Sequence, residues 1–437
     1  MPKFNEDNTT EQMLLTTLQR SGWEYIPAEE LDREESDVMV ESMVRAALIR
    51  LNPEIAEDER RADEVIYKLR TLFLSTNAQN LVTQNEAFKE LVFEKNSYPF
   101  GENGRQVSID LFGTEVNGKL DQNQYVVTNQ WVYPKKNGGK LLVNGFPFAI
   151  GELKTPVRAA ITWLDGAQDI NKYEQSIPQM FVSNVFNFAT EGRYYRYGSV
   201  CMPAAKYGPW HTTEDKSDGS LAAVQTSVQD MITPYKMMDL FQFFTLYATD
   251  SKYRKYKVIA RYQQYEGGNM IVDRVRAGYP KKGLIWHFQG SGKSYLMEFA
   301  AVKLRMLPDL MNPTVLIVDD RLDLESQITA QFHSSDVGNL ESASTREQLM
   351  TMLRQDIRKI IITTIFRFQE VTGELSLRDN IIVMVDECHR TQEGDLGIKM
   401  RAALPNAFFF GLTGTPINRI DKNTLPPLVP QKTAAAI

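Results

Sequence analysis

Five nearly continuous apolar runs in the second half of the chain constrain its fold more than any other feature of the sequence. They are Gly283–Phe288, Thr314–Val318, Lys359–Thr364, Ile381–Val385 and Phe408–Leu412. Turns and helical stretches alternate with these runs. Strands that are apolar on both faces are typical of parallel sheets whose two sides are covered by helices. Residues 257–424 are therefore predicted to form an α/β domain around a parallel sheet.

The first half of the chain has a mixed periodicity. Residues 11–77 show the three- and four-residue apolar spacing of helices. From about residue 107 the spacing becomes that of short strands, and Asn-Gly pairs at 117–118, 137–138 and 144–145 are typical of hairpin turns between them. The expected strands are Val107–Phe112, Tyr125–Trp131, Leu141–Val143, Phe146–Leu153, Gln179–Asn184, Phe186–Thr190 and Arg193–Ser199. With a helix at Trp163–Ser176, they predict an α+β domain over residues 1–201.

The remaining segments and the composition add weaker constraints. Residues 202–256, with an aromatic-rich helix, are interpreted as a join between domains, and residues 425–437 as an irregular terminus. The net charge of −6 gives no sign of nucleic-acid binding, although a whole-chain sum can hide a local basic track. Two distant cysteines, Cys201 and Cys388, suit a reducing compartment. No apolar run approaches the roughly 20 residues of a membrane span, so a cytoplasmic protein with no membrane contact is expected.

A phosphate-binding loop is predicted between the first apolar run and the helical stretch that follows it. Its residues are Gly290, Ser291, Gly292, Lys293 and Ser294. Glycines allow backbone N–H groups to face phosphates, the lysine neutralises phosphate charge, and the serine hydroxyl reaches Mg²⁺. The loop departs from the general pattern at His287, which stands where the first glycine is usual. On this segment alone, a glycine-rich turn between a strand and a helix is the alternative interpretation.

Two adjacent carboxylates, Asp386 and Glu387, follow the apolar run Ile381–Val385. Ligands of open parallel sheets bind at the carboxyl ends of the strands. ATP hydrolysis requires one carboxylate that holds Mg²⁺ and another that orients the attacking water. We assign Asp386 to the metal and Glu387 to the water. A third segment, Gly411–Pro416, follows another strand, and the three segments in this order indicate an ATPase.

The three segments, together with the acidic box Asp386–His389, resemble superfamily-two helicases and translocases. Ile285–Ser294, Leu316–Leu324 and Thr363–Phe368 are more closely similar to the motor (R) subunit of type I restriction enzymes. The resemblance implies that the second half of the chain is a RecA-like P-loop lobe. Its implied cofactors are ATP and Mg²⁺.

The same resemblance implies roles for individual residues. Gln264, supported by Arg261, is expected to read the adenine edge. Coupling of the nucleotide state to the grip on DNA is expected at His389, Thr413, Gly414 and Thr415. Contacts with the DNA backbone are expected at Arg321, Thr364 and Arg367. Packing against the sheet edge is the alternative for the histidine, and a solvated side chain is the alternative for the two arginines.

In the first half, Glu152 and Lys154 lie two residues apart on an expected strand and therefore share one face. A carboxylate for Mg²⁺ and a lysine that polarises the water or the phosphate are ingredients of phosphodiester cleavage. A Glu/Lys ladder on an edge strand is the alternative. The flanking segments Val143–Pro147 and Tyr173–Phe181 are similar to the nuclease domain of the same R subunits. This resemblance implies a restriction-nuclease fold of the PD-(D/E)xK type.

The resemblance is incomplete at one metal ligand. The family's metal-binding aspartate precedes the glutamate by fourteen residues, and this position is Gly138. Asp110 and Asp121 are the nearest upstream aspartates, and either one could supply the ligand if the strands align differently. The glutamine that the family has four residues before its tyrosine is also displaced, because Asp169 occupies that position here. The nuclease fold is expected, whereas nuclease activity stays open.

Taken with the resemblance, the chain is interpreted as a fragment or truncated form of a type I motor and nuclease subunit. The implied partners are double-stranded DNA and the methyltransferase (M) and specificity (S) subunits. No second lobe follows Pro416, so weak ATP binding and poor hydrolysis are expected. The alternative is a nuclease-inactive, hydrolysis-incompetent module that only docks on the methyltransferase complex or on DNA. A stand-alone helicase is a third interpretation, which the N-terminal domain disfavours.

Overall fold

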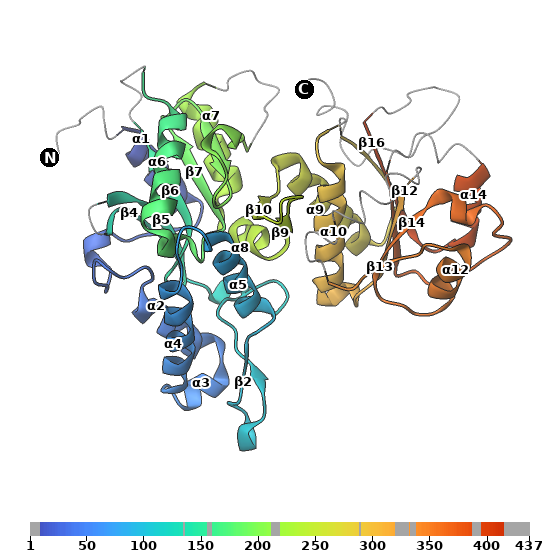
Figure 1. Ribbon diagram of the computed structural model, residues 1–437, viewed down its shortest axis with the longest axis horizontal. Coiled ribbons are helices and arrows are strands. Elements are labelled where there is room, and N and C mark those ends of the chain that lie inside the picture. Colours follow the sequence, from blue (N-terminus) through green and yellow to red (C-terminus); the bar gives the residue numbers. More distant parts are fainter. Residues whose placement is uncertain are drawn as a thin grey trace. The chain divides into compact units, whose positions relative to one another are not determined.

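The computed structural model describes residues 9–133, 136–154, 160–210, 219–287, 290–319, 332, 338–386 and 395–414. The chain divides into two compact units (Figure 1). The first comprises Met1–Thr245 and Tyr253–Ile259, and the second comprises Leu246–Lys252 and Ala260–Ile437. The chain passes from one unit to the other in the region of β9 (Thr245–Thr249) and β10 (Lys255–Ile259).

The first unit contains a six-stranded mixed sheet with the order β1-β4-β5-β6-β7-β8. Its strands are β1 (Glu24–Tyr25), β4 (Tyr125–Tyr133), β5 (Lys136–Val143), β6 (Phe146–Leu153), β7 (Phe186–Thr190) and β8 (Tyr195–Gly198). The pairs β1/β4 and β6/β7 are parallel, and the other neighbours are antiparallel. A separate antiparallel pair joins β2 (Ser97–Tyr98) and β3 (Val107–Ser108). The predicted α+β character of this half is confirmed.

The described residues of the first unit also form helices. They are α1 (Thr9–Arg20), α2 (Glu41–Leu51), α3 (Pro53–Glu57), α4 (Arg61–Leu74), α5 (Leu81–Phe93), α6 (Trp163–Ser176), α7 (Leu221–Met231) and α8 (Pro234–Phe243). Of these helices, α1, α6 and α7 contact the strands of this sheet. Helix α6 packs on β6 and β7 and matches its predicted bounds. It begins at a capping box, in which the Thr162 hydroxyl accepts from the N–H of Leu164 and the Asp165 carboxylate accepts from the N–H of Thr162.

The hairpin between β5 and β6 has the turn that the sequence predicts. Asn144 and Gly145 have φ angles of 48° and 85°, as a two-residue type I′ turn requires. A side chain at Gly145 would also meet the Val40 carbonyl oxygen, because a Cβ there would lie 2.5 Å from it. The pairing of β5 with β6 continues from this hairpin through a register shift between Leu141 and Leu142 to the pair Gly139 and Gly151, next to Glu152.

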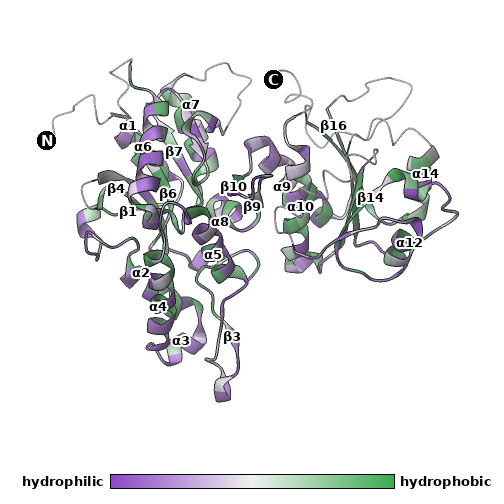
Figure 2. Ribbon diagram, viewed as in Figure 1, coloured by the Kyte–Doolittle hydropathy of each residue, from purple (hydrophilic) through white to green (hydrophobic). Residues whose placement is uncertain are grey.

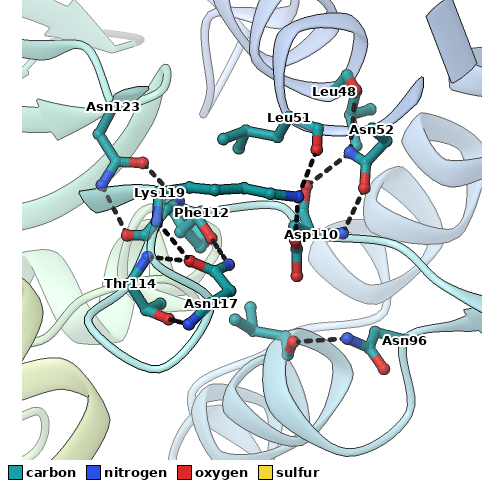
Figure 3. A network of polar contacts seen from close by, with 12 residues as sticks. Leu48, Leu51, Asn52, Asn96, Asp110, Phe112, Thr114, Asn117, Lys119 and Asn123 are labelled. Atoms are coloured by element: carbon teal, nitrogen blue, oxygen red, sulfur yellow. Dashed lines mark hydrogen bonds and ion pairs between the residues drawn. The ribbon is translucent and has the colours of Figure 1, made fainter. Parts of the chain in front are cut away.

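The structure corrects three other expectations in this half. Asn137 and Gly138 lie within β5, opposite Val132 and Trp131 of β4, and do not form a turn. Asn117 and Gly118 lie in the long loop between β3 and β4, where the Asn117 amide donates to the Phe112 carbonyl (Figure 3). The segment Gln179–Asn184 contains the end of a 3-10 helix, Pro178–Phe181, in place of a strand.

The fold of the first unit also buries a carboxyl group, Glu174 of α6, which is 1% exposed. Its oxygens accept hydrogen bonds from the Asn171 amide, the Asn187 amide and the Cys201 backbone N–H. Burial nevertheless raises the pKa of Glu174 to about 7.

This buried carboxyl predicts a pH dependence of stability. The folded pKa is raised above the unfolded value, so the folded chain binds more protons between these two values. The free energy of unfolding is therefore expected to fall as the pH rises through about 5 to 7, with the loss complete above the folded pKa. Urea unfolding at a series of pH values checks this slope. Glu174→Gln should flatten it, and an equal slope in the variant would contradict the assignment to Glu174.

The second unit contains a six-stranded sheet with the order β11-β16-β15-β12-β14-β13, in which every neighbouring pair is parallel. Its strands are β11 (Lys282–Trp286), β12 (Thr314–Asp319), β13 (Leu340–Ser342), β14 (Ile360–Thr364), β15 (Ile381–Val385) and β16 (Phe408–Thr413). Its helices are α9 (Tyr262–Ala277), α10 (Lys293–Met306), α12 (Arg346–Arg354) and α14 (Asp395–Ala403). The parallel α/β fold predicted from the apolar runs is confirmed.

The hydrophobic core of the second unit explains this fold. The residues of β12, β14 and β15 are buried along their whole length, and Figure 2 shows the strands of this sheet largely in the hydrophobic colour. The strand β13 escaped prediction because it is three residues long and only half-buried. Within the described residues, no helix combines the length and the apolar character needed to cross a membrane.

Candidate nucleotide site and nuclease-like centre

The carboxyl edge of the parallel sheet gathers the residues of the predicted nucleotide site. His287 follows β11, and Asp386 follows β15, and both of these strands are neighbours of β16. Because all the strands are parallel, their carboxyl ends meet at one edge. Lys293, which begins α10 after the loop, is 8% exposed, and Asp386 is also 8% exposed. The lysine and the first carboxylate therefore belong to the same edge of one sheet.

The glycines of the loop have the backbone that the motif requires. Gly290 and Gly292 both have φ of 81°, in the left-handed region. A Cβ at Gly292 would lie 2.4 Å from Nε2 of Gln264, so no side chain fits there without displacing this amide. Helix α10 begins directly after Gly292, and the N-terminal end of a helix favours an anion. This backbone fits a phosphate chain, and Asp386 lies at the same edge of the sheet.

Gln264 connects the start of α9 to the loop. Its Nε2 donates to the carbonyls of Ser291 (3.1 Å) and Gly292 (3.2 Å), and its Oε1 accepts from the backbone N–H of Arg261 (2.8 Å). Both ends of the carboxamide are thus engaged within the protein. The reading of adenine by Gln264 stays a prediction.

The predicted coupling segment lies beside the loop. The N–H of His287 donates to the Thr413 carbonyl (2.9 Å), and the Trp286 indole donates to the Gly414 carbonyl (3.2 Å). The end of β16 is therefore tied to the end of β11 by both backbone and side chain. Ser294 is half-buried at the start of α10.

The other predicted residues of this unit divide into two groups. Thr364 ends β14 with a fully buried side chain, and Arg367 follows it and donates to the hydroxyl of Thr363 (3.2 Å). Four predicted site residues lie outside the described part of the chain, namely Arg321, Glu387, His389 and Thr415.

In the first unit, Lys154 lies between two carboxylates. Its Nζ is 3.0 Å from Oε1 of Glu152 and 2.7 Å from Oδ2 of Asp169. Glu152 is on β6 and Asp169 is on α6, which approaches β6 closely at Gly166. The hydroxyl of Tyr173, one turn after Asp169, is 3.5 Å from Oε2 of Glu152. Glu152 and Lys154 thus lie together, as predicted, and α6 contributes the second acid.

Asp169 was not predicted as a site residue. A signal was present, because Asp169 and Tyr173 are four residues apart on the predicted helix and so share one of its faces. Only the packing of that face on β6 reveals what it contacts.

One metal ligand that the resemblance implies is missing from this centre. Gly139 pairs with Gly151 across β5 and β6, so the next antiparallel position places Gly138 opposite Glu152. No carboxylate stands there. Within the described residues, no group of three or more His, Cys, Asp or Glu could hold a metal ion.

Asp110, one of the two upstream aspartates that could supply the missing ligand, belongs to a different network (Figure 3). Its carboxylate is 2.8 Å from Nζ of Lys119. Its backbone N–H and carbonyl both bond the Asn52 side chain. Lys119 also donates to the Leu51 carbonyl. These contacts give Asp110 a role in attaching its loop to α2.

The charges of the nuclease-like centre balance internally. Burial raises the pKa of Glu152, although the hydrogen bond from Lys154 opposes this shift. Burial alone would lower the pKa of Lys154, but the bonds to Asp169 and Glu152 raise it above its usual value. Burial would raise the pKa of Asp169, yet the bonds from Lys154 and Lys172 lower it. On β5, burial lowers the pKa of Lys140 to about 8.

A cavity of about 240 Å³ adjoins this centre. It lies between α1 and strands β4 to β6, and Glu152 and Lys140 contribute to its wall. Gly139 and Gly151, which pair across β5 and β6, also line this cavity.

Two segments of the chain match family models of known proteins. Residues 3–204 match the family model described as the N terminus of the type I restriction enzyme R protein, and residues 263–427 match the model of the SWI2/SNF2 ATPases. The first segment is thus similar to the N-terminal domain of type I restriction R proteins, and the second is similar to the SWI2/SNF2 ATPases.

The chain is similar over nearly its whole length to type I restriction endonuclease subunits. It is 31% identical to the HindI endonuclease subunit of Haemophilus influenzae, covering 96% of this chain and 43% of that protein. It is 27% identical to the putative MjaIXP endonuclease subunit of Methanocaldococcus jannaschii, covering 97% and 43% respectively. The chain thus spans less than half the length of these relatives.

A solved structure, the Sulfolobus solfataricus SWI2/SNF2 ATPase core in complex with dsDNA, has 14% identity and a TM-score of 0.28. The match covers 36% of this chain and 32% of the chain in the solved structure.

Proposed function

We propose that this chain is part of the motor of a type I restriction enzyme, in which ATP with Mg²⁺ is bound at the carboxyl edge of the parallel sheet. The observation that carries the proposal is the common edge of the loop before Lys293 and the strand before Asp386. Gly290, Ser291 and Gly292 would surround the phosphates, and Lys293 would neutralise their charge.

Other residues complete the proposed site. Ser294 and Asp386 would hold Mg²⁺, and Glu387 would orient the attacking water. Thr413 and Gly414, with Thr415 and His389, would couple the nucleotide state to the grip on DNA. The proposed DNA contacts are Arg321 and Arg367, since the side chain of Thr364 is fully buried.

In the proposed enzyme, ATP hydrolysis drives the translocation of double-stranded DNA. The chain would work beside methyltransferase and specificity subunits, and the N-terminal domain would be placed to cut the DNA. A titration of the chain with a fluorescent ATP analogue and Mg²⁺, followed by a DNA-stimulated ATPase assay, tests the first half of this proposal. Absence of saturable binding would contradict it.

A second candidate for the N-terminal domain is a nuclease-like module that binds without cutting. The observation that favours it is that Lys154 forms ion pairs with both Glu152 and Asp169, while Gly138 provides no carboxylate where the resemblance implies one. Plasmid nicking that requires Mg²⁺ and is lost in Glu152→Ala or Lys154→Ala would support the cleaving domain. Equal, metal-independent background nicking by the wild-type chain and by both variants would support the module that does not cut.

The second candidate makes a prediction about Gly138. Gly138→Asp would place a carboxylate opposite Glu152, so this variant is expected to gain saturable binding of Mn²⁺. The measurement is electron paramagnetic resonance of Mn²⁺ without nucleotide, in a Lys293→Ala background that disables the phosphate loop. Gly139→Asp is the matched control, because the neighbouring residue of a strand faces the other side of the sheet. Saturable Mn²⁺ binding by the Lys293→Ala chain with Gly138 unchanged would contradict the second candidate.

A further inference from the structure

His287 occupies the position where the general phosphate-binding loop has its first glycine. The N–H of His287 donates to the Thr413 carbonyl of β16, and so continues the backbone hydrogen bonding between β11 and β16. Its φ is not among the positive φ angles of this chain, whereas Gly290 and Gly292 both have positive φ. The backbone conformation at position 287 therefore does not require glycine, and a side chain is tolerated there.

The imidazole of His287 contacts a residue four positions further along the chain, Ser291. Its Nδ1 lies 2.5 Å from Oγ of Ser291, and the whole residue is 6% exposed. On the other side of the same residue, the Ser291 carbonyl accepts from Gln264. Ser291 is thus held by its hydroxyl and by its carbonyl, from two different elements.

We propose that His287 is a positioning residue of the phosphate loop, and that its hydrogen bond to Ser291 fixes the loop in its phosphate-binding shape. This inference rests on the proposed nucleotide site and adds a residue to it. His287 acts through Ser291 on the backbone N–H groups of the loop. A loop shaped in advance loses less conformational freedom when it binds, so the bond contributes to nucleotide affinity.

The electrostatic surroundings of His287 are consistent with this role. Burial, with a smaller effect from the Lys293 charge, lowers the pKa of His287 to about 4. The ring is therefore neutral near pH 7, and it adds no charge to the loop. A neutral ring nitrogen can accept from the serine hydroxyl or donate to it, depending on the tautomer.

A matched pair of substitutions tests the inference. The amide of asparagine reaches the position of Nδ1, whereas the amide of glutamine reaches that of Nε2. His287→Asn should keep the affinity for mant-ATP with Mg²⁺ within about twofold, whereas His287→Gln and Ser291→Ala should each weaken it about three- to tenfold, as expected for one hydrogen bond. The double variant His287→Gln/Ser291→Ala should lose no more than either single variant, because both remove the same bond.

A second measurement separates positioning from a general loss of structure. Hydrogen exchange without nucleotide should be faster at Gly290–Gly292 in His287→Gln and unchanged in β12. The ratio of wild-type affinity to His287→Gln affinity should be the same for mant-GTP as for mant-ATP, because the loop holds phosphates rather than the base. Ser176→Ala removes an exposed hydroxyl of the other unit and serves as the control for loss of a serine.

Three outcomes would overturn the inference. They are wild-type affinity in His287→Gln, equal weakening by asparagine and glutamine, and additive losses in the double variant. A wild-type chain that does not bind mant-ATP would contradict the proposed function itself, and the inference would fall with it. The exchange measurement distinguishes these cases, because it requires no nucleotide.

Discussion

Replacement of Lys293 by alanine is expected to weaken the binding of ATP with Mg²⁺ by about 10- to 100-fold. A hydrogen bond to a charged group contributes roughly 1.5–3 kcal/mol, and each 1.4 kcal/mol is a factor of about ten in affinity. Lys293 is the first residue of α10 and is almost fully buried at the edge of the sheet, so its charge is poorly screened there. Isothermal titration calorimetry with ATP and Mg²⁺ measures the loss.

The control for this variant is Lys282→Ala. Lys282 is an exposed lysine at the opposite end of β11 from the loop. Its replacement removes the same charge from the same strand-loop-helix segment, and it should leave the affinity within a factor of about two, as is usual for surface charges. Equal losses in the two variants would mean that Lys293 acts only through net charge, and the assignment of the phosphate site would fail.

The largest effect on stability is expected for Gly113→Ala, in the loop that Figure 3 shows between Phe112 and Asn123. A Cβ at Gly113 would lie 1.8 Å from the backbone carbonyl oxygen of Lys119, which cannot move independently of the chain. The Asn123 amide also bonds both the N–H and the carbonyl of Gly113, at 2.8 Å each. We expect a loss of about 3 kcal/mol, at the upper end of the cost of overpacking.

Differential scanning calorimetry measures this loss as a fall in the melting temperature. For a unit of this size, roughly 3 kcal/mol corresponds to a fall of about 6–12 °C. Gly139→Ala is the control, because the nearest atoms to a Cβ there are 3.7 and 3.8 Å away. A change of less than about 2 °C for Gly113→Ala would contradict the expected overlap.

The elements with a clear apolar period were predicted well. The bounds of β6, α6, β7 and β15 are those expected from the sequence. The turn at Asn144 and Gly145 was also found correctly, because it joins two strongly apolar strands. The pair Asn137 and Gly138 misled the prediction, since the same dipeptide can lie within a strand when the neighbouring strand β4 supplies the pairing.

The nuclease-like centre was only partly accessible from the sequence. Glu152 and Lys154 were found from their spacing, and Gly138 was found by counting along the chain. The register of β5 and β6 then places Gly138 opposite Glu152. The contact between Asp169 and Lys154 depends on how α6 packs against β6, and no local pattern encodes that approach.

The phosphate site was predicted more completely because its signal is local. The glycines, Lys293 and the start of α10 are neighbours in sequence, so a strand-loop-helix pattern was sufficient. The side-chain bonds from Gln264 and His287 to Ser291 were not predicted. Gln264 is distant in sequence, and the role of His287 depends on the rotation of one side chain.

The central claim is that Lys293 and Asp386 act on one nucleotide, with Asp386 holding its Mg²⁺. The affinity for ATP, measured with and without Mg²⁺ in the wild-type chain and in Asp386→Asn, tests this claim most directly. We predict that Mg²⁺ strengthens binding by about tenfold or more in the wild-type chain and has little effect in the variant, while the Mg²⁺-free affinities stay similar. An equal effect of Mg²⁺ in both chains would contradict the claim.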